Sequence, residues 1–170
     1  MEYRAAVITM SDKGSQGLRE DTAGDRVVEI LEENGWKVEY RTMIPDDFEQ
    51  IKSELIKCSD ELKITLTVTT GGTGFSMRDV TPEATLAVAD REVRGIPEAM
   101  RMLTMKYTSR SILSRAAAGI RKRSLVINLP GSPKAAEENF MAVNEPVKHG
   151  LRILRGEPMN CAEIIDEKKS

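Results

Sequence analysis

The chain has 170 residues, of which 40% are hydrophobic and 31% are charged, as expected for one soluble domain that buries a full core. A net charge of -2 and an aromatic content of 4% provide neither the basic surface nor the stacking platforms that nucleic-acid binding needs. No apolar run approaches the length of a membrane span, and the amino-terminal MEYRAAVITM is too polar for a signal peptide. We therefore expect a cytoplasmic protein with reduced thiols that binds neither nucleic acid nor membranes.

Predicted strands and helices alternate along the chain, and each follows from the spacing of its apolar residues. The first half contains a strand at 5–10, a helix at 21–34, a strand at 36–40, a helix at 45–62 and a strand at 64–70. The second half contains a helix that starts at 81, helices at about 97–107 and 112–118, a strand at 124–129 and a helix at 135–143. This alternation indicates an α/β fold with a mostly parallel sheet covered on both faces.

Single residues predict where several elements begin and end. Asp46, with an acid three residues later, resembles a capping box at the start of a helix, and Thr81 before a proline resembles an N-cap. Gly35 and Gly119 are typical of the C′ position that ends a helix. Polar and apolar residues alternate at 36–40, which favours an edge or half-exposed strand.

The domain organisation predicted from the sequence is simple. We expect one domain over residues 1–156 and a polar tail over residues 157–170. Ligands of open α/β sheets bind beyond the carboxyl ends of the strands. Two glycine-containing loops, at 70–74 and 128–134, leave predicted strands at that edge. We therefore expect the two loops to share one site.

The stretch TTGGTGFSMRDVTPEA, at residues 69–84, connects a predicted buried strand to a helix. It lacks the Lys-Ser/Thr pair of a P-loop and the spacing of GxGxxG, so neither standard nucleotide fingerprint is present. A tight structural turn is one interpretation of its glycines. The other is an anion-binding loop, because backbone N–H groups and the hydroxyls of Thr69, Thr70 and Thr73 could bind a phosphate.

Two further loops are candidates for the same site. In the loop at 128–134, prolines stiffen the chain, Gly131 permits a turn, and Lys134 places a cation near a helix start, where a neighbouring phosphate would explain it. The first strand-to-helix loop, at 11–24, is long for such a connection. Long loops in compact domains are typical of functional sites, and a disordered surface excursion is the alternative interpretation.

Asp46 and Asp79 are the candidate catalytic acids. Each has a structural interpretation as a helix cap. The functional interpretation needs both, because transfer of a phosphoryl or nucleotidyl group uses a hard cation that carboxylates and phosphates hold together. Two acids, each between a strand and a helix at the ligand edge of the sheet, could supply a Mg²⁺ site.

The cysteines and the histidine predict no further chemistry. Cys58 and Cys161 lack CxxC spacing and a visible base, which disfavours catalysis by a thiol. His149 is the only histidine, and it has no partner at metal-binding or catalytic-triad spacing.

Taken together, these motifs resemble those of the MogA/MoaB family of molybdenum-cofactor biosynthesis, the molybdopterin adenylyltransferases. The residues that carry the resemblance are, in order, Ser11-Asp12 with Gly17, Asp21 and Gly24; Pro45-Asp46; TTGGTG with Arg78-Asp79 and Thr81-Pro82-Glu83-Ala84; and NLPGSPKA from Asn128 to Ala135. The match runs in order over about Ala5 to Leu154, and the combination is far more specific than any one motif.

The resemblance implies a three-layer α/β/α fold, a homotrimer, and transfer of AMP from ATP to the terminal phosphate of molybdopterin with release of pyrophosphate. It implies that Asp46 and Asp79 are the catalytic acids. Because the attacking phosphate oxygen is already ionised at neutral pH, we expect both acids to be Mg²⁺ ligands rather than proton acceptors. The resemblance also implies that the substrates are bound by Ser11, Asp12, Thr70, Gly71, Gly72, Thr73, Gly74, Arg78, Asn128, Pro130, Gly131, Ser132 and Lys134. Transient contacts with molybdopterin synthase and with molybdate-insertion proteins follow from the same resemblance.

Two other functions remain open. A non-catalytic molybdopterin-binding or scaffolding protein of the same fold would be favoured by loss of Asp46 or Asp79, but both acids are present. The second is an enzyme of this fold that acts on another nucleotide substrate.

The sequence gives some support to the expected trimer. One predicted helix carries more apolar residues than a single core-facing stripe requires, namely Met100, Met102, Leu103 and Met105.

Overall fold

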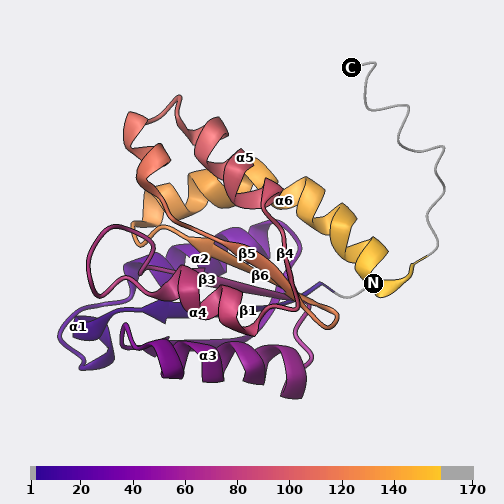
Figure 1. The fold of residues 1–170 in the computed structure, drawn as a ribbon, viewed down its shortest axis with the longest axis horizontal. Helices are drawn as coiled ribbons and strands as arrows, with labels where there is room; N and C mark the ends of the chain where they lie inside the picture. Colours follow the sequence, from indigo (N-terminus) through magenta and orange to yellow (C-terminus); the bar gives the residue numbers. More distant parts are fainter. Residues whose placement is uncertain (1–2, 158–170) are drawn as a thin grey trace.

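The computed structural model describes residues 3–157 as a six-stranded sheet with helices on both faces (Figure 1). In chain order the elements are β1 (Arg4–Met10), α1 (Asp12–Ser15), α2 (Thr22–Glu33), β2 (Lys37–Ile44), α3 (Phe48–Ile56), β3 (Leu66–Thr70), α4 (Thr81–Val88), β4 (Arg91–Glu92), α5 (Gly95–Thr104), β5 (Ala118–Arg121), β6 (Ser124–Leu129) and α6 (Pro133–Arg155). A π-helical turn (Lys57–Glu61) extends α3, and a 3₁₀ helix (Ser109–Leu113) follows α5.

The sheet is mostly parallel, with the strand order β2-β1-β3-β6-β5-β4. Strands β2, β1, β3 and β6 run in the same direction, whereas β5 is antiparallel to both β6 and β4. The predicted edge position of the strand after Gly35 is confirmed, because β2 forms one edge of the sheet. Within residues 3–157 no helix has the length and apolar character to cross a membrane.

Helices α2, α5 and α6 cover one face of the sheet, and α3 and α4 cover the other (Figure 1). Each face has its own apolar core: Val68 and Phe140 belong to the first, and Ile8 and Leu55 to the second. Successive side chains of a strand point to opposite faces, so Val7 and Ile8 of β1 separate into different cores. The predicted three-layer α/β/α fold is confirmed.

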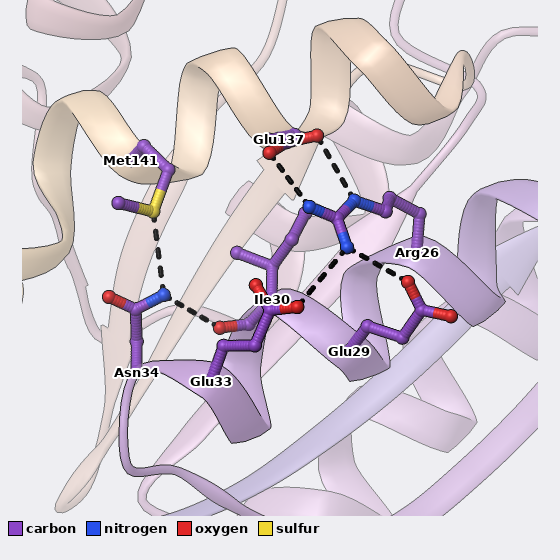
Figure 2. Close-up of polar contacts among 7 residues, drawn as sticks. All are labelled: Arg26, Glu29, Ile30, Glu33, Asn34, Glu137 and Met141. Carbon is purple, nitrogen blue, oxygen red and sulfur yellow. Dashed lines mark hydrogen bonds and ion pairs between the residues drawn. The ribbon is translucent and has the colours of Figure 1, made fainter.

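A charged cluster joins α2 to the beginning of α6 (Figure 2). Arg26 of α2 donates to both carboxylate oxygens of Glu137 in α6, at 3.0 and 2.8 Å, and also contacts Glu29 of its own helix. These carboxylates raise the pKa of Arg26, because they stabilise its charged form. Farther along, Asn34 donates to the sulfur of Met141. The start of α6, and with it the loop at 130–132, is therefore fixed relative to α2.

The helix predicted at 21–34 is confirmed at both ends. Its N-cap is Asp21, whose side chain accepts a hydrogen bond from the backbone N–H of Gly24 at 2.9 Å. At the other end Gly35 has φ +80°, a left-handed conformation that glycine adopts without steric cost.

The predicted helix starts at Asp46 and Thr81 are each displaced by one residue. The N-cap of α3 is Asp47, which accepts from the N–H of Gln50 at 2.9 Å, so the capping box assigned to Asp46 is wrong. The N-cap of α4 is Val80, and Thr81 is already helical. The hydroxyl of Thr81 is buried and has no hydrogen-bond partner among the described residues.

The helix predicted at 112–118 is wrong. Residues 109–113 form the 3₁₀ helix, and the chain then extends into β5. Gly119 does not end a helix but lies in β5, where an added Cβ would come within 2.5 Å of the Cβ of Ala89. The predicted helix at 135–143 is too short, because α6 continues to Arg155 with Pro146 inside it. The tail predicted at 157–170 lies outside the described residues except for Glu157.

Candidate functional site

A polar cavity of about 350 Å³ lies where β1 and β3 end, the edge at which open α/β sheets bind ligands. Seven residues predicted for the site line it: Ser11, Asp12, Asp46, Thr70, Gly72, Asp79 and Gly131. They lie at or just after the carboxyl ends of β1, β2, β3 and β6. The structure thus brings the two glycine-containing loops together at one cavity.

Asp46 and Asp12 are joined by two hydrogen bonds, each from the backbone N–H of one residue to the carboxylate of the other. The N–H of Asp12 donates to the carboxylate of Asp46 at 3.3 Å, and the N–H of Asp46 donates to the carboxylate of Asp12 at 3.0 Å. Arg78 completes the group with two hydrogen bonds to Asp12, at 2.8 and 3.0 Å. Because Asp47 caps α3, Asp46 does not cap the helix that follows it, and it lies in the cavity wall.

The charges around Asp46 disfavour its ionised form. Burial raises the pKa of Asp46, and the negative charge of Asp12 raises it further, with a smaller contribution from Asp79. The opposite holds for Asp12, whose pKa is lowered by the hydrogen bonds from Arg78. The N–H of Asp12 and the charge of Arg78 offset this effect only in part, so a cation bound beside Asp46 and Asp79 would relieve an unfavourable interaction.

Asp79 is held by a turn in its own loop. Its carboxylate accepts a hydrogen bond from the N–H of Ser76 at 3.0 Å, and its N–H donates to the carbonyl of Ser76 at 3.0 Å. Helix α4 receives no side-chain cap, so the interpretation of Asp79 as a helix cap is wrong. This turn leaves the Asp79 carboxylate in the wall of the cavity that contains Asp46.

Two glycines of the TTGGTG loop are required by the backbone. Gly71 has φ +100° and Gly72 has φ +65°, both in the left-handed region. A Cβ on Gly71 would lie 2.6 Å from the carbonyl oxygen of Met10. A Cβ on Gly72 would lie 2.3 Å from the Thr81 hydroxyl and 2.9 Å from an Asp46 carboxylate oxygen. The tight-turn interpretation of the loop is therefore correct, and the turn also packs directly against the acidic site.

The same loop offers unpaired backbone donors. The N–H of Gly71 donates to the carbonyl of Leu129, but those of Gly72, Thr73 and Gly74 have no hydrogen-bond partner within residues 3–157. Successive free N–H groups in a glycine turn form a concavity that suits an anion. The structure therefore supports both interpretations of the loop, a turn and an anion-binding loop.

Asn128 does not lie in the cavity. It is fully buried in β6, where its amide donates to the hydroxyls of Thr69 and Thr85 at 3.0 and 2.8 Å and its oxygen accepts from the N–H of Ala117. Its polar groups are thus satisfied inside the protein. The Asn128 side chain thus joins β6 to β3 and α4, and contact of Asn128 with a ligand stays a prediction that these bonds do not support.

The other predicted residues lie around the cavity rather than in its wall. The carbonyl of Pro130 accepts from the Thr70 hydroxyl at 2.8 Å, and Ser132 is the N-cap of α6. Thr73, Gly74 and Pro130 line a second cavity of about 410 Å³. Lys134 has an 86% exposed side chain that pairs with Glu138 at 3.8 Å, and it does not line the first cavity.

Part of the cavity wall was not predicted residue by residue. It comprises Thr9, Met10, Lys13, Arg19, Glu20, Asp21, Thr22, Ala23 and Met43. Most of these belong to the loop at 11–24, whose length predicted a functional role without indicating which side chains face the ligand. Asp21 lines the cavity as well as capping α2, and it accepts from the Thr9 hydroxyl at 2.9 Å.

The described cysteine is structural. Cys58 lies in the π-helical turn after α3 and is completely buried. Burial raises the pKa of its thiol to about 12, so it carries almost no thiolate at neutral pH.

The donor set of the cavity fits Mg²⁺. The carboxylates of Asp46 and Asp79 supply oxygen, the ligand type that this cation prefers, and the buried Thr81 hydroxyl beside Gly72 lacks a partner among the described residues. No three metal-binding side chains of residues 3–157 form a complete cage. This arrangement matches a cation that takes one or two carboxylates from the protein and the rest from phosphates and water.

The fold and this cavity define a class: an α/β protein with a polar, acid-lined cavity at the carboxyl edge of its parallel strands. Comparison with known proteins specifies it further. The family model described as a probable molybdopterin binding domain matches residues 6–149, and the chain belongs to this family.

Individual relatives agree with this assignment. The chain is similar to the molybdopterin adenylyltransferase of Helicobacter pylori strain J99, at 41% identity over 92% of this chain and 90% of that protein. It is 39% identical to that of Escherichia coli K12 over 87% of this chain and 79% of that protein. The crystal structure of the molybdopterin biosynthesis enzyme MoaB from Thermus thermophilus superposes with a TM-score of 0.86, at 40% identity over 93% of this chain and 99% of that one. The predicted resemblance to the MogA/MoaB family is confirmed.

Proposed function

We propose that this chain is a molybdopterin adenylyltransferase, which transfers AMP from ATP to the terminal phosphate of molybdopterin and releases pyrophosphate. Relatives with this name cover most of the chain at about 40% identity, as given above. The observation that carries the proposal is the placement of Asp46 and Asp79 with the glycine loop in one cavity, where neither acid caps the helix that follows it.

The chemistry explains why the site contains acids but no obvious base. The attacking group is a phosphate oxygen that is already ionised at neutral pH, so a general base would add little. Catalysis then depends on positioning and on charge stabilisation. Mg²⁺ held by Asp46 and Asp79 would neutralise charge on the phosphates.

The remaining residues bind and orient the substrates. The free N–H groups of Gly72, Thr73 and Gly74 bind a phosphate. Ser11 lies in the same cavity wall as Gly72, whereas Thr73 and Gly74 line the neighbouring cavity. Arg78 is held beside the cavity by Asp12, so its guanidinium is near the incoming anionic groups.

The biological setting follows from the proposed reaction. The enzyme works in the cytoplasm, receives molybdopterin from molybdopterin synthase and passes its product to molybdate-insertion proteins. These contacts are transient, since the substrate and product must enter and leave one cavity.

The test of this function is the release of pyrophosphate from ATP by the purified chain. Release should require molybdopterin and should stop when EDTA removes divalent cations. Binding of molybdopterin without pyrophosphate release would instead indicate a scaffolding protein. Pyrophosphate release that does not depend on molybdopterin would indicate an enzyme for another nucleotide substrate.

We also propose that the enzyme is a homotrimer. Met102, Leu103 and Met105 are exposed by 72%, 52% and 50%, although Met100 is buried in the core and contributes nothing to this surface. Light scattering at micromolar concentration should report a trimer, and Leu103→Glu should shift it toward the monomer by placing a charge in the interface. Ile153→Glu, at an exposed position on α6, is the matched control and should remain trimeric. A wild-type monomer would contradict the proposal.

Gly72→Ala should weaken ATP binding by about tenfold or more, because the new Cβ displaces both the Thr81 hydroxyl and the Asp46 carboxylate. Gly35→Ala is the control: Gly35 also has positive φ, but a Cβ there meets no heavy atom within 4 Å. Both variants should lose about 1 kcal/mol of stability from the backbone conformation. Calorimetric titration with ATP separates them, and equal affinities would show that Gly72 serves only the turn.

A further inference from the structure

Arg115 contacts both ends of the loop that carries Asp79. It lies between the 3₁₀ helix and β5, and its backbone N–H donates to the carbonyl of Thr73 at 2.9 Å. Its guanidinium donates to the carbonyl of Gly74 at 2.7 Å and to the carbonyl of Asp79 at 2.6 Å. The third side of the guanidinium pairs with the carboxylate of Glu83 in α4.

One planar group therefore closes the loop from 74 to 79. The donors of an arginine point in fixed directions, so the two carbonyls can move little relative to each other while both bonds are made. The Asp79 carboxylate lies directly over Gly74, since a Cβ on that glycine would be 2.9 Å from a carboxylate oxygen. Holding the two ends of the loop thus also holds the acid that faces the cavity.

Arg115 does not line the cavity of Asp46 and Asp79. Its own segment is anchored by a second arginine, Arg101 of α5, which donates to the carbonyls of Ser114 and Ala116 at 3.1 Å each. The two arginines differ in what they hold: Arg101 fixes residues 114–116, whereas Arg115 reaches from that segment to the Asp79 loop.

We propose that Arg115 is a positioning residue for adenylyl transfer, which orients the Asp79 carboxylate by holding the carbonyls of Gly74 and Asp79. This inference rests on the proposed function, because it assigns to Asp79 a role in that reaction. Lysine cannot replace Arg115, since a single ammonium group does not span two carbonyls and a carboxylate in this geometry.

The experiment compares Arg115→Lys with Arg101→Lys in the full chain. For Arg115→Lys, kcat should fall by about tenfold or more while the KM values for ATP and molybdopterin stay within about twofold. Amide hydrogen exchange should become faster for residues 74–80 and should be unchanged in β3 and β6. Arg101→Lys should lower the melting temperature without accelerating exchange of the Asp79 loop relative to the rest of the protein.

Chemical rescue gives a further readout that a general structural role would not produce. Millimolar guanidinium should raise the turnover of Arg115→Ala several-fold and leave the wild type unchanged. Arg115→Lys with wild-type kcat and wild-type loop exchange would overturn the inference, and so would faster exchange spread evenly over the sheet. If the wild type releases no pyrophosphate, the proposed function fails, and the hydrogen exchange of the loop alone then decides whether Arg115 holds Asp79.

Discussion

Replacing Asp46 with asparagine should lower turnover by about a hundredfold or more while the melting temperature stays at or above that of the wild type. Activity should fall because the variant loses the negative charge that we propose to hold the cation and to organise the phosphates. Stability is retained because Asp46 is partly buried beside two other acids, so removal of its charge also removes a repulsion. An amide oxygen can still accept the hydrogen bond from the N–H of Asp12.

The neighbouring Asp47 provides the matched control. Asp47→Ala should lose about 1 kcal/mol of stability, because it removes the N-cap of α3, and should keep wild-type turnover. The two variants are thus expected to separate activity from stability at adjacent positions. Turnover and urea denaturation measured on both variants would show whether Asp46 acts in catalysis and Asp47 in stability. An active Asp46→Asn enzyme would reject a catalytic role for this acid.

Asp79→Asn should also reduce turnover by about a hundredfold, with molybdopterin affinity and melting temperature close to wild type. Asparagine can still accept the hydrogen bond from the N–H of Ser76, so the turn around residues 76–79 is retained and only the charge is lost. Asp79→Ala should lose the charge and also loosen the loop.

Asp90→Asn is the control for loss of a loop carboxylate charge away from the cavity. Asp90 accepts a hydrogen bond from the N–H of Lys122, as Asp79 does from Ser76, but it does not line the cavity. Its asparagine variant should keep full turnover. If Asp79→Asn is equally active, the Asp79 carboxylate serves only to shape its loop.

The fold was largely predictable because its strands and main helices bury strong apolar patterns. β1, β3 and β6 consist mainly of apolar or β-branched residues, and β6 matches its predicted range. The second half was harder. β4 and β5 are too short to show a period, and their pairing depends on contacts that only the folded chain brings together. Asn144 and Pro146 interrupt the apolar pattern of α6, yet packing on α2 and the sheet continues the helix past them.

For the site, motif residues identified the acids and the glycine loop, but not which polar groups the fold satisfies internally. Asn128 and Lys134 belong to the same motif, and the fold buries one and exposes the other. Asp47 rather than Asp46 caps α3. The two acids are adjacent, and helix propensity alone does not place a helix start to within one residue. Arg115 belongs to none of the motifs that predicted the site. Its proposed role depends on contacts with a loop about 40 residues earlier in the chain, such as its hydrogen bond to the carbonyl of Gly74.

The burial of Cys58 has a consequence for handling the proposed substrate. Molybdopterin carries a dithiolene, whose sulfur atoms bind soft metals and can form a mixed disulfide with a reactive thiol when an oxidant removes two electrons. Within residues 3–157 the chain presents no accessible thiol, since its one cysteine there is buried with a raised pKa. The wall of the acidic cavity offers mainly oxygen and nitrogen groups instead, apart from the thioethers of Met10 and Met43. The proposed substrate would therefore meet no reactive thiol in this part of the protein, so even an oxidant would not join its sulfur atoms to residues 3–157 in a mixed disulfide.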